Sequence, residues 1–150
     1  MRVVYYDHGA RDAAQPGFRF GEAGGVHVTS EGDVETDSRV PIGPNSLHAL
    51  EGHGVVADLN RLPLVTGPIA PGRDAVLRPF GLEDASRILY EADRKTYGGV
   101  HEFVVHESDV PERVQYRIVI DNREYQRTLS RLQYLVTLAS REGFGVRIRL

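Results

Sequence analysis

A long amphipathic helix in the last third of the chain is the feature that most constrains the fold. Apolar residues recur at helical spacing between residues 121 and 142, on the stripe Tyr125, Leu129, Leu132, Val136 and Ala139. Asp121 and Glu124 have the spacing of a capping box, in which Asp121 caps the helix and Glu124 reaches back. Gly143 stands where many helices end in the left-handed conformation. Such a stripe must be covered by a sheet or by other helices.

The segments on either side of this helix alternate between apolar and polar residues, as strands with one buried face do. Val114–Ile120 precedes the helix and Phe144–Leu150 follows it, while a further strand is expected at His101–His106. These segments predict a ββαβ core over residues 101–150. A crossover of this length allows the last strand to run parallel to Val114–Ile120, and we expect that pairing.

The first two thirds of the chain are predicted to be β-rich and irregular. The apolar run at Arg2–Tyr6 predicts a strand. Val26–Val28 and Val34–Val40 flank a turn-forming stretch around Gly32, which predicts a β-hairpin. The return strand of this hairpin is polar, so at least one of its faces must be exposed to solvent.

A second helix is expected at Leu82–Lys95, where apolar residues again share one face. Acidic residues lie in its first turn and basic residues in its last, as the helix dipole favours. A strand at Ala75–Leu77 precedes it, and the glycines at positions 98 and 99 end it. The predicted fold class is therefore α+β, with two helices in a single domain over residues 1–150.

The segment 41–73 between the hairpin and this helix is rich in proline and glycine and has no clear periodicity. Loops inside compact domains usually have about 4–6 residues, so a connection of this length is unusual. Its many apolar residues argue against disorder. The sequence therefore predicts an extended arm or lid that packs against something, a partner included, with brief regular pieces only at Leu47–Leu50 and Val55–Leu59.

The composition excludes several classes of protein and site. The chain contains no cysteine, which excludes disulfides, thiolate catalysis and cysteine-based zinc sites. No apolar stretch approaches the roughly 18 residues needed to span a bilayer, and no signal peptide is recognisable. We therefore expect no membrane association, and a protein located in the cytoplasm or in a virion assembled there.

The charges are distributed unevenly along the chain. The formal net charge is −3, but residues 111–150 carry eight arginines and only four acids, whereas residues 1–110 are strongly acidic. This asymmetry predicts self-association through unlike surfaces, in which a basic face meets an acidic body and the 41–73 arm supplies apolar contacts. The alternative is internal, because the basic segment can also neutralise the acidic body within one monomer.

The candidate interaction residues are arginines of this basic segment. Arg123, Arg127 and Arg131 recur every four residues and so form a stripe on the long helix, away from its apolar face. On the predicted strands, alternation places the remaining candidates on the face opposite the apolar residues: Arg117, Arg147 and Arg149. Phosphate or an acidic protein surface would suit these groups, and an ordinary solvated surface is the simpler interpretation.

The candidates for catalysis or metal binding are weaker. Asp7 and His8 follow the first strand and, with Asp12, could contribute to a metal site only if a distant histidine joined them. His48 and His53 lie five residues apart, a spacing that does not share one face of a helix.

Two further histidines lie on one predicted strand. His101 and His106 are five residues apart, which places them on opposite faces if the strand is regular. We therefore expect no metal and no cofactor. The chain also contains no phosphate-binding loop and no nucleophile motif.

Three classes of function follow in order of preference. The first is a non-enzymatic structural or assembly protein, a subunit of a homo- or hetero-oligomeric particle such as a phage virion component. The second is a small metal-dependent hydrolase that uses Asp7 and His8 with a distant histidine. The third is a nucleic-acid-binding or regulatory module that uses the arginine surface, which the acidic overall charge does not favour. The expected partner is a protein, with nucleic acid possible.

Overall fold

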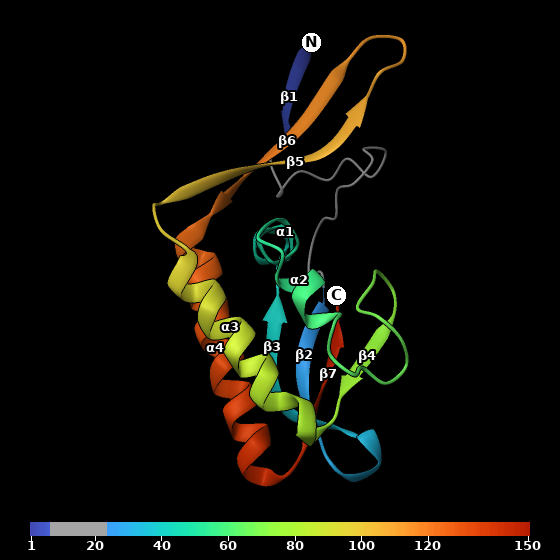
Figure 1. Ribbon diagram of the computed structural model, residues 1–150, viewed down its shortest axis with the longest axis vertical. Coiled ribbons are helices and arrows are strands. Elements are labelled where there is room, and N and C mark those ends of the chain that lie inside the picture. The colour runs from blue at the N-terminus through green and yellow to red at the C-terminus, as the bar shows by residue number, and fades with distance from the viewer. Residues whose placement is uncertain (7–23) are drawn as a thin grey trace.

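The computed structural model describes residues 1–6 and 24–150 of the chain. These residues form four α-helices and seven strands in two separate sheets, which confirms the α+β class. Figure 1 shows a larger sheet covered by helices and a smaller, elongated sheet that projects from one end of the molecule. The two predicted helices are present, and two more lie in the segment predicted as an arm.

The larger sheet has four strands in the order β3-β2-β7-β4, and each neighbouring pair is antiparallel. The strands are β2 (Gly24–Thr29), β3 (Glu35–Ile42), β4 (Asp74–Leu77) and β7 (Gly145–Arg149). The predicted hairpin is confirmed as β2 and β3. A short 3₁₀ helix, η1 (Glu31–Asp33), makes its turn, and the glycine at its centre has a positive φ of 76°.

Two long helices pack on the apolar face of this sheet. They are α3 (Leu82–Lys95), which a short 3₁₀ helix η2 (Pro79–Gly81) precedes, and α4 (Asn122–Glu142). The bounds predicted for α3 are confirmed, as is the buried stripe of α4, where all five predicted residues are buried. Gly143 ends α4 with a left-handed φ of 70°, as predicted. The helix stripe and the alternating strands therefore share one core.

The start of α4 differs in one detail from the predicted capping box. The side chain of Asp121 accepts hydrogen bonds from the backbone N–H groups of Arg123 and Glu124, at 2.9 and 3.3 Å, so Asp121 is the N-cap. Its own backbone N–H, however, donates to the side-chain oxygen of Asn45 at 2.8 Å rather than to Glu124. A buried side chain from another helix thus replaces the local partner that the sequence suggested.

The smaller sheet has three strands in the order β1-β6-β5. β1 (Arg2–Tyr6) runs parallel to β6 (Val114–Asp121), and β6 forms an antiparallel hairpin with β5 (Val100–Ser108). The predicted parallel pairing of the last strand with β6 is wrong. β7 instead lies between β2 and β4 in the larger sheet, because α4, with 21 residues, spans about 30 Å and carries the chain to the other end of the molecule.

The prediction of an extended arm over residues 41–73 is also wrong. The segment contains α1 (Pro44–Gly52) and α2 (Val55–Leu59), and its apolar side chains lie in the core of the same chain. Leu47 is fully buried and Ile69 is only 5% exposed. Helices of nine and five residues are too short to show a clear periodicity, which explains why the sequence pattern revealed only α2 with its correct bounds.

None of the described helices is both long enough and apolar enough to cross a membrane.

The packing of α4 leads to a first prediction. Leu132 is 5% exposed in the core, whereas Arg127 is exposed on the opposite side of the same helix. Replacing Leu132 with Ala should lower the free energy of unfolding by about 2–5 kcal/mol, because it removes buried contacts and leaves a cavity. Replacing Arg127 with Ala should change it by less than about 0.5 kcal/mol. Urea denaturation followed by circular dichroism measures both, and equal effects would contradict the orientation of α4.

Candidate interaction surfaces

The six predicted interaction arginines do not form one surface. Arg147 and Arg149 lie on the larger sheet, on the face away from the helices, and Arg117 lies on the smaller sheet. The other three lie along α4: Arg123, Arg127 and Arg131. Their different surroundings separate the arginines that are engaged within the chain from those available for a partner.

Arg147 and Arg149 are held by acidic residues of two other strands of the same sheet, β3 and β4. The guanidinium of Arg149 contacts Asp74 at 2.6 Å and Glu35 at 3.0 Å, and Arg147 contacts Glu35 at 3.4 Å. Arg147 also donates to the backbone carbonyl of Asp33 at 2.8 Å. The hydrogen bond from Arg149 lowers the pKa of Asp74 below its ordinary value. Acidic residues of the same chain thus neutralise these two arginines. This is the alternative to self-association that the uneven charge distribution allowed.

The arginines of α4 have a different environment. Arg123, Arg127 and Arg131 are exposed, and none of them forms an ion pair with a residue in the described part of the chain. Together with Gln126 and Ser130 they line a shallow hollow of about 450 Å³. These three are therefore the predicted interaction residues that form no ion pair with the described part of the chain.

The smaller sheet has an outer face that no described element covers. Strand alternation and the cross-strand register place four exposed apolar side chains on it. Their exposed fractions are 55% for Tyr5, 67% for Val100, 47% for Val104 and 37% for Val119. The other face carries Ile118 and Ile120, which are fully buried against the body. Figure 1 shows that α1 lies on only one side of this sheet.

An ion pair lies in the middle of this outer face. The guanidinium of Arg117 contacts the carboxylate of Glu102 at 3.5 Å, and the hydroxyl of Tyr5 donates to the same carboxylate at 3.4 Å. Arg117 also donates to the side chain of Gln115, on the same strand. The face thus has one positive and one negative group near its centre. Around them lie the four exposed apolar side chains, together with Gln115 and Glu107, which are joined by a hydrogen bond.

A cluster of aromatic rings lies where the smaller sheet meets the helices. The ring of His53 stacks on Tyr125, with the ring centroids 4.8 Å apart and the planes 7° apart. It meets Phe103 edge to face at 4.9 Å, and His101 lies 5.0 Å away. Its Nε2 atom is 3.4 Å from the side-chain oxygen of Asn122, at the start of α4. The cluster therefore joins α1, β5 and α4.

The surroundings of this cluster favour the neutral form of His53. Burial lowers its pKa most, the hydrogen bond with Asn122 raises it, and the nearby His101 lowers it again, with a net decrease. Burial also raises the pKa of Tyr125 well above its ordinary value. Tyr125 thus stays a neutral packing group, and His53 is the group whose protonation the fold disfavours.

The residues proposed for metal binding or catalysis do not form one site in the described part of the chain. Asp7, His8 and Asp12 lie outside the described residues. Among the residues that are described, no group of three or more histidine, aspartate or glutamate side chains could hold a metal ion. His48 is buried on α1, at 3% exposure. Among the described candidates, His53 and His101 have their rings in contact, with the centroids 5.0 Å apart.

The prediction that His101 and His106 lie on opposite faces of their strand is wrong. A register shift between Val104 and His106 adds a residue, so that His101 pairs with Ile120 and His106 with Tyr116, which belong to the same face of β6. Their partners are four residues apart, which is about 13 Å in a strand. The two histidines thus share a face, but they are too far apart to bind one ion.

Sequence reasoning missed the outer face of the smaller sheet. Its signal is the unusual alternation in β5 and β6, where valines occupy both faces instead of one. The aromatic cluster had no signal of this kind, because it joins residues from three elements whose contacts depend on the fold.

Three comparisons with known proteins gave no match: no family model, no curated protein and no solved structure is similar to this chain.

The aromatic cluster predicts a dependence of stability on pH. The folded chain holds the pKa of His53 below the value of about 6.5 expected when the chain is unfolded. The contribution of His53 to stability is therefore complete above that pH and is lost as the pH falls below it, because the unfolded chain binds the additional proton. Urea denaturation at several values between pH 7.5 and 5 should show this loss.

Two variants test the assignment. In His53→Gln the loss of stability between pH 7 and 5 should become smaller, since the titrating group is gone. In His101→Gln the loss should also become smaller, because removing the neighbouring charge brings the folded pKa closer to the unfolded one. An unchanged pH profile in His53→Gln would contradict the prediction.

Proposed function

We propose that this chain is a non-enzymatic assembly subunit that associates with a second copy of itself through the outer face of the smaller sheet. The observation that carries the proposal is the apolar outer face around the Arg117–Glu102 ion pair, which no element of the described residues covers. Exposed apolar patches on otherwise polar proteins commonly mark interaction sites.

The arrangement of charges favours a second copy as the partner. A two-fold contact brings the same patch of both subunits together. Each contact between two different residues therefore occurs twice, once in each direction across the axis. If the axis passes between Arg117 and Glu102, the arginine of one subunit faces the glutamate of the other, and the reverse pair forms on the other side of the axis. Both charges remain compensated while the surrounding valines are buried.

The size of the face indicates that the contact is weak. The three strands have 5, 8 and 9 residues and lie about 4.8 Å apart, so they cover a projected area on the order of 350 Å². Standard stable interfaces bury about 800 Å² on each partner. We therefore expect dissociation in the micromolar range or weaker, unless further surfaces contribute in a larger particle.

This contact replaces the head-to-tail association that the charge asymmetry predicted. In that arrangement the 41–73 segment would supply the apolar contacts, yet its apolar residues belong to the core of the monomer. Two of the six arginines are also engaged by Glu35 and Asp74. The outer face offers apolar contacts and the Arg117–Glu102 ion pair without disturbing the core.

Sedimentation velocity on two charge-reversal variants tests the proposal. Wild type should form a reversible dimer at about 100 μM and low salt. Arg117→Glu and Glu102→Arg should each be monomeric, because each places like charges opposite one another across the axis. An equimolar mixture of the two variants should form a 1:1 heterodimer, since one subunit then has two negative groups and the other two positive groups. The ion pair within each chain stays broken in the mixture, so only contact between chains can restore association.

The control is the double variant Arg127→Glu/Arg131→Glu, which reverses charges on α4 and leaves the outer face intact. It should dimerise as wild type does, whereas head-to-tail association through α4 would be lost. A wild type that remains monomeric at about 100 μM, or a mixture that remains monomeric, would contradict the proposal. Circular dichroism should show that each variant is folded.

A further inference from the structure

We propose that the groove between α4 and β3 binds an extended acidic segment of a partner protein. This inference rests on a surface remote from the outer face of the smaller sheet, and it does not depend on self-association. The groove has a volume of about 630 Å³. It continues into the hollow lined by the arginines of α4, because Ser130 and Arg131 belong to both.

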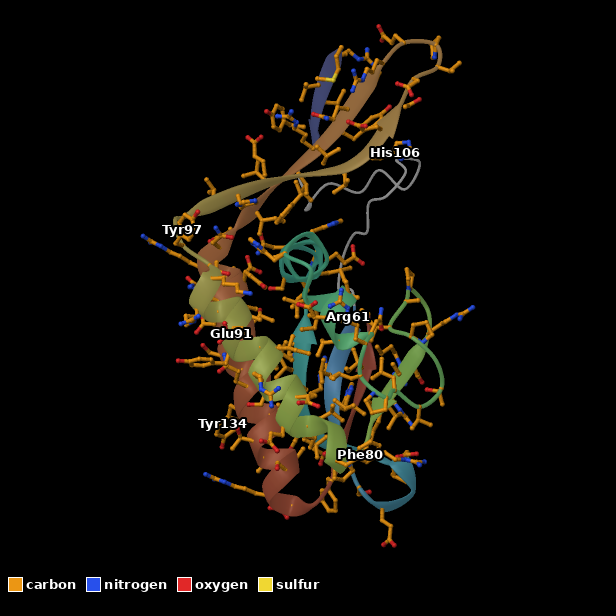
Figure 2. The ribbon with its side chains drawn as sticks, viewed as in Figure 1. Arg61, Phe80, Glu91, Tyr97, His106 and Tyr134 are labelled. Atoms are coloured by element: carbon orange, nitrogen blue, oxygen red, sulfur yellow. The ribbon has the colours of Figure 1, made fainter. Side chains whose placement is uncertain are left out.

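The groove has an apolar floor and an aromatic side chain at its margin. Val40 and Pro41 contribute from β3, while Leu135 and Leu138 contribute from α4. Tyr134 also lines the groove and is 70% exposed, and Figure 2 shows it on the outer side of α4. Val40 and Leu135 are buried, at 6% and 4% exposure, so the apolar surface that aliphatic side chains of a ligand would remove from water belongs to Pro41, Leu138 and Tyr134.

The three arginines of α4, which we call the arginine row, indicate which charge and which spacing a matching ligand would have. Residues four apart on a helix are separated by about 6 Å along its axis, so Arg123, Arg127 and Arg131 span about 12 Å. Side chains on one face of an extended chain repeat every 6.5 Å or so. Acidic residues at alternate positions of an extended segment therefore match the three guanidinium groups one by one, and each carboxylate can accept two hydrogen bonds from an arginine.

The lining favours a peptide over a nucleic acid. Proteins that bind single strands stack successive bases on aromatic side chains, whereas the floor here is aliphatic and Tyr134 is the aromatic residue among those that line the groove. Asp37 and Arg39 also line it, so the groove itself has one charge of each sign next to the arginines of α4. An acidic segment that ends in apolar residues can place its carboxylates on the arginines of α4 and its apolar end over Tyr134 and Leu138.

The direct test is fluorescence anisotropy with a labelled peptide of sequence Glu-Ser-Glu-Ser-Glu-Ser-Leu-Val-Leu. A second peptide of the same composition, with its three glutamates adjacent, tests the spacing. The alternating peptide should bind at least about 5-fold more tightly than the block peptide. Its affinity should fall with added salt, because exposed charges are screened as the Debye length falls from about 10 Å to 3 Å.

Matched variants of α4 locate the site. Arg127→Glu and Arg131→Glu should each weaken binding about 10-fold or more, and Tyr134→Ala should weaken it about 3-fold. Arg141→Glu changes the same charge on the same helix outside both hollows and should leave binding unchanged. The monomeric variant Arg117→Glu should bind as wild type does, which separates this site from the proposed dimer contact.

Three results would overturn the inference. The first is equal weakening by Arg141→Glu and Arg131→Glu, which would indicate a general effect of charge. The second is equal binding of the alternating and block peptides. The third is tighter binding of a ten-residue oligothymidylate than of the alternating peptide, with the same dependence on Arg127 and Arg131, which would assign the surface to nucleic acid.

Discussion

The contact between Asn45 and the backbone of Asp121 holds the two parts of this molecule together. The buried amide of Asn45 accepts from the backbone N–H of Asp121 at 2.8 Å and donates to its carbonyl at 3.0 Å. Asp121 ends β6 of the smaller sheet and caps α4, which covers the larger sheet. The amide therefore fixes the orientation of α1 relative to both. Asn45 is 2% exposed, so breaking these two hydrogen bonds would leave buried polar groups without partners. The free energy of unfolding would then fall by about 1–3 kcal/mol.

A second contact supports the same junction from inside the core. The hydroxyls of Ser46 and Thr128 lie 2.7 Å apart, which joins α1 to α4 about two turns beyond the cap. His53, at the other end of α1, contacts Asn122 and stacks on Tyr125. α1 is thus bound to α4 at three places by side chains rather than by backbone pairing. This arrangement lets a short helix without a strong apolar stripe occupy a central position.

The parts of the fold that could be predicted from the sequence are those whose signal is local. The stripe of α4, its cap at Asp121 and the left-handed Gly143 each depend on residues within a few positions of one another, and so do the hairpins. The destination of β7 could not be predicted, since its alternation fits either sheet. The same holds for α1, whose position depends on Asn45 and on partners some eighty residues away. The arginines of α4 were found from their spacing, whereas the ion pairs of Arg147 and Arg149 depend on strand order.

The central position of β7 has a consequence for the order in which the chain folds. β7 pairs with β2, more than a hundred residues earlier in the chain, and with β4 on its other side. Before β7 is synthesised, β2 and β4 have no common neighbour, and the apolar face of the larger sheet cannot close. During translation the ribosome therefore releases most of the chain before its core can form. Pairing of strands this distant in sequence also slows folding. The chain between them must lose conformational entropy when the loop closes, before the new contacts compensate that loss. Until then, β2 and β4 expose edges that other chains can pair with, so protection by chaperones is most important before β7 has paired.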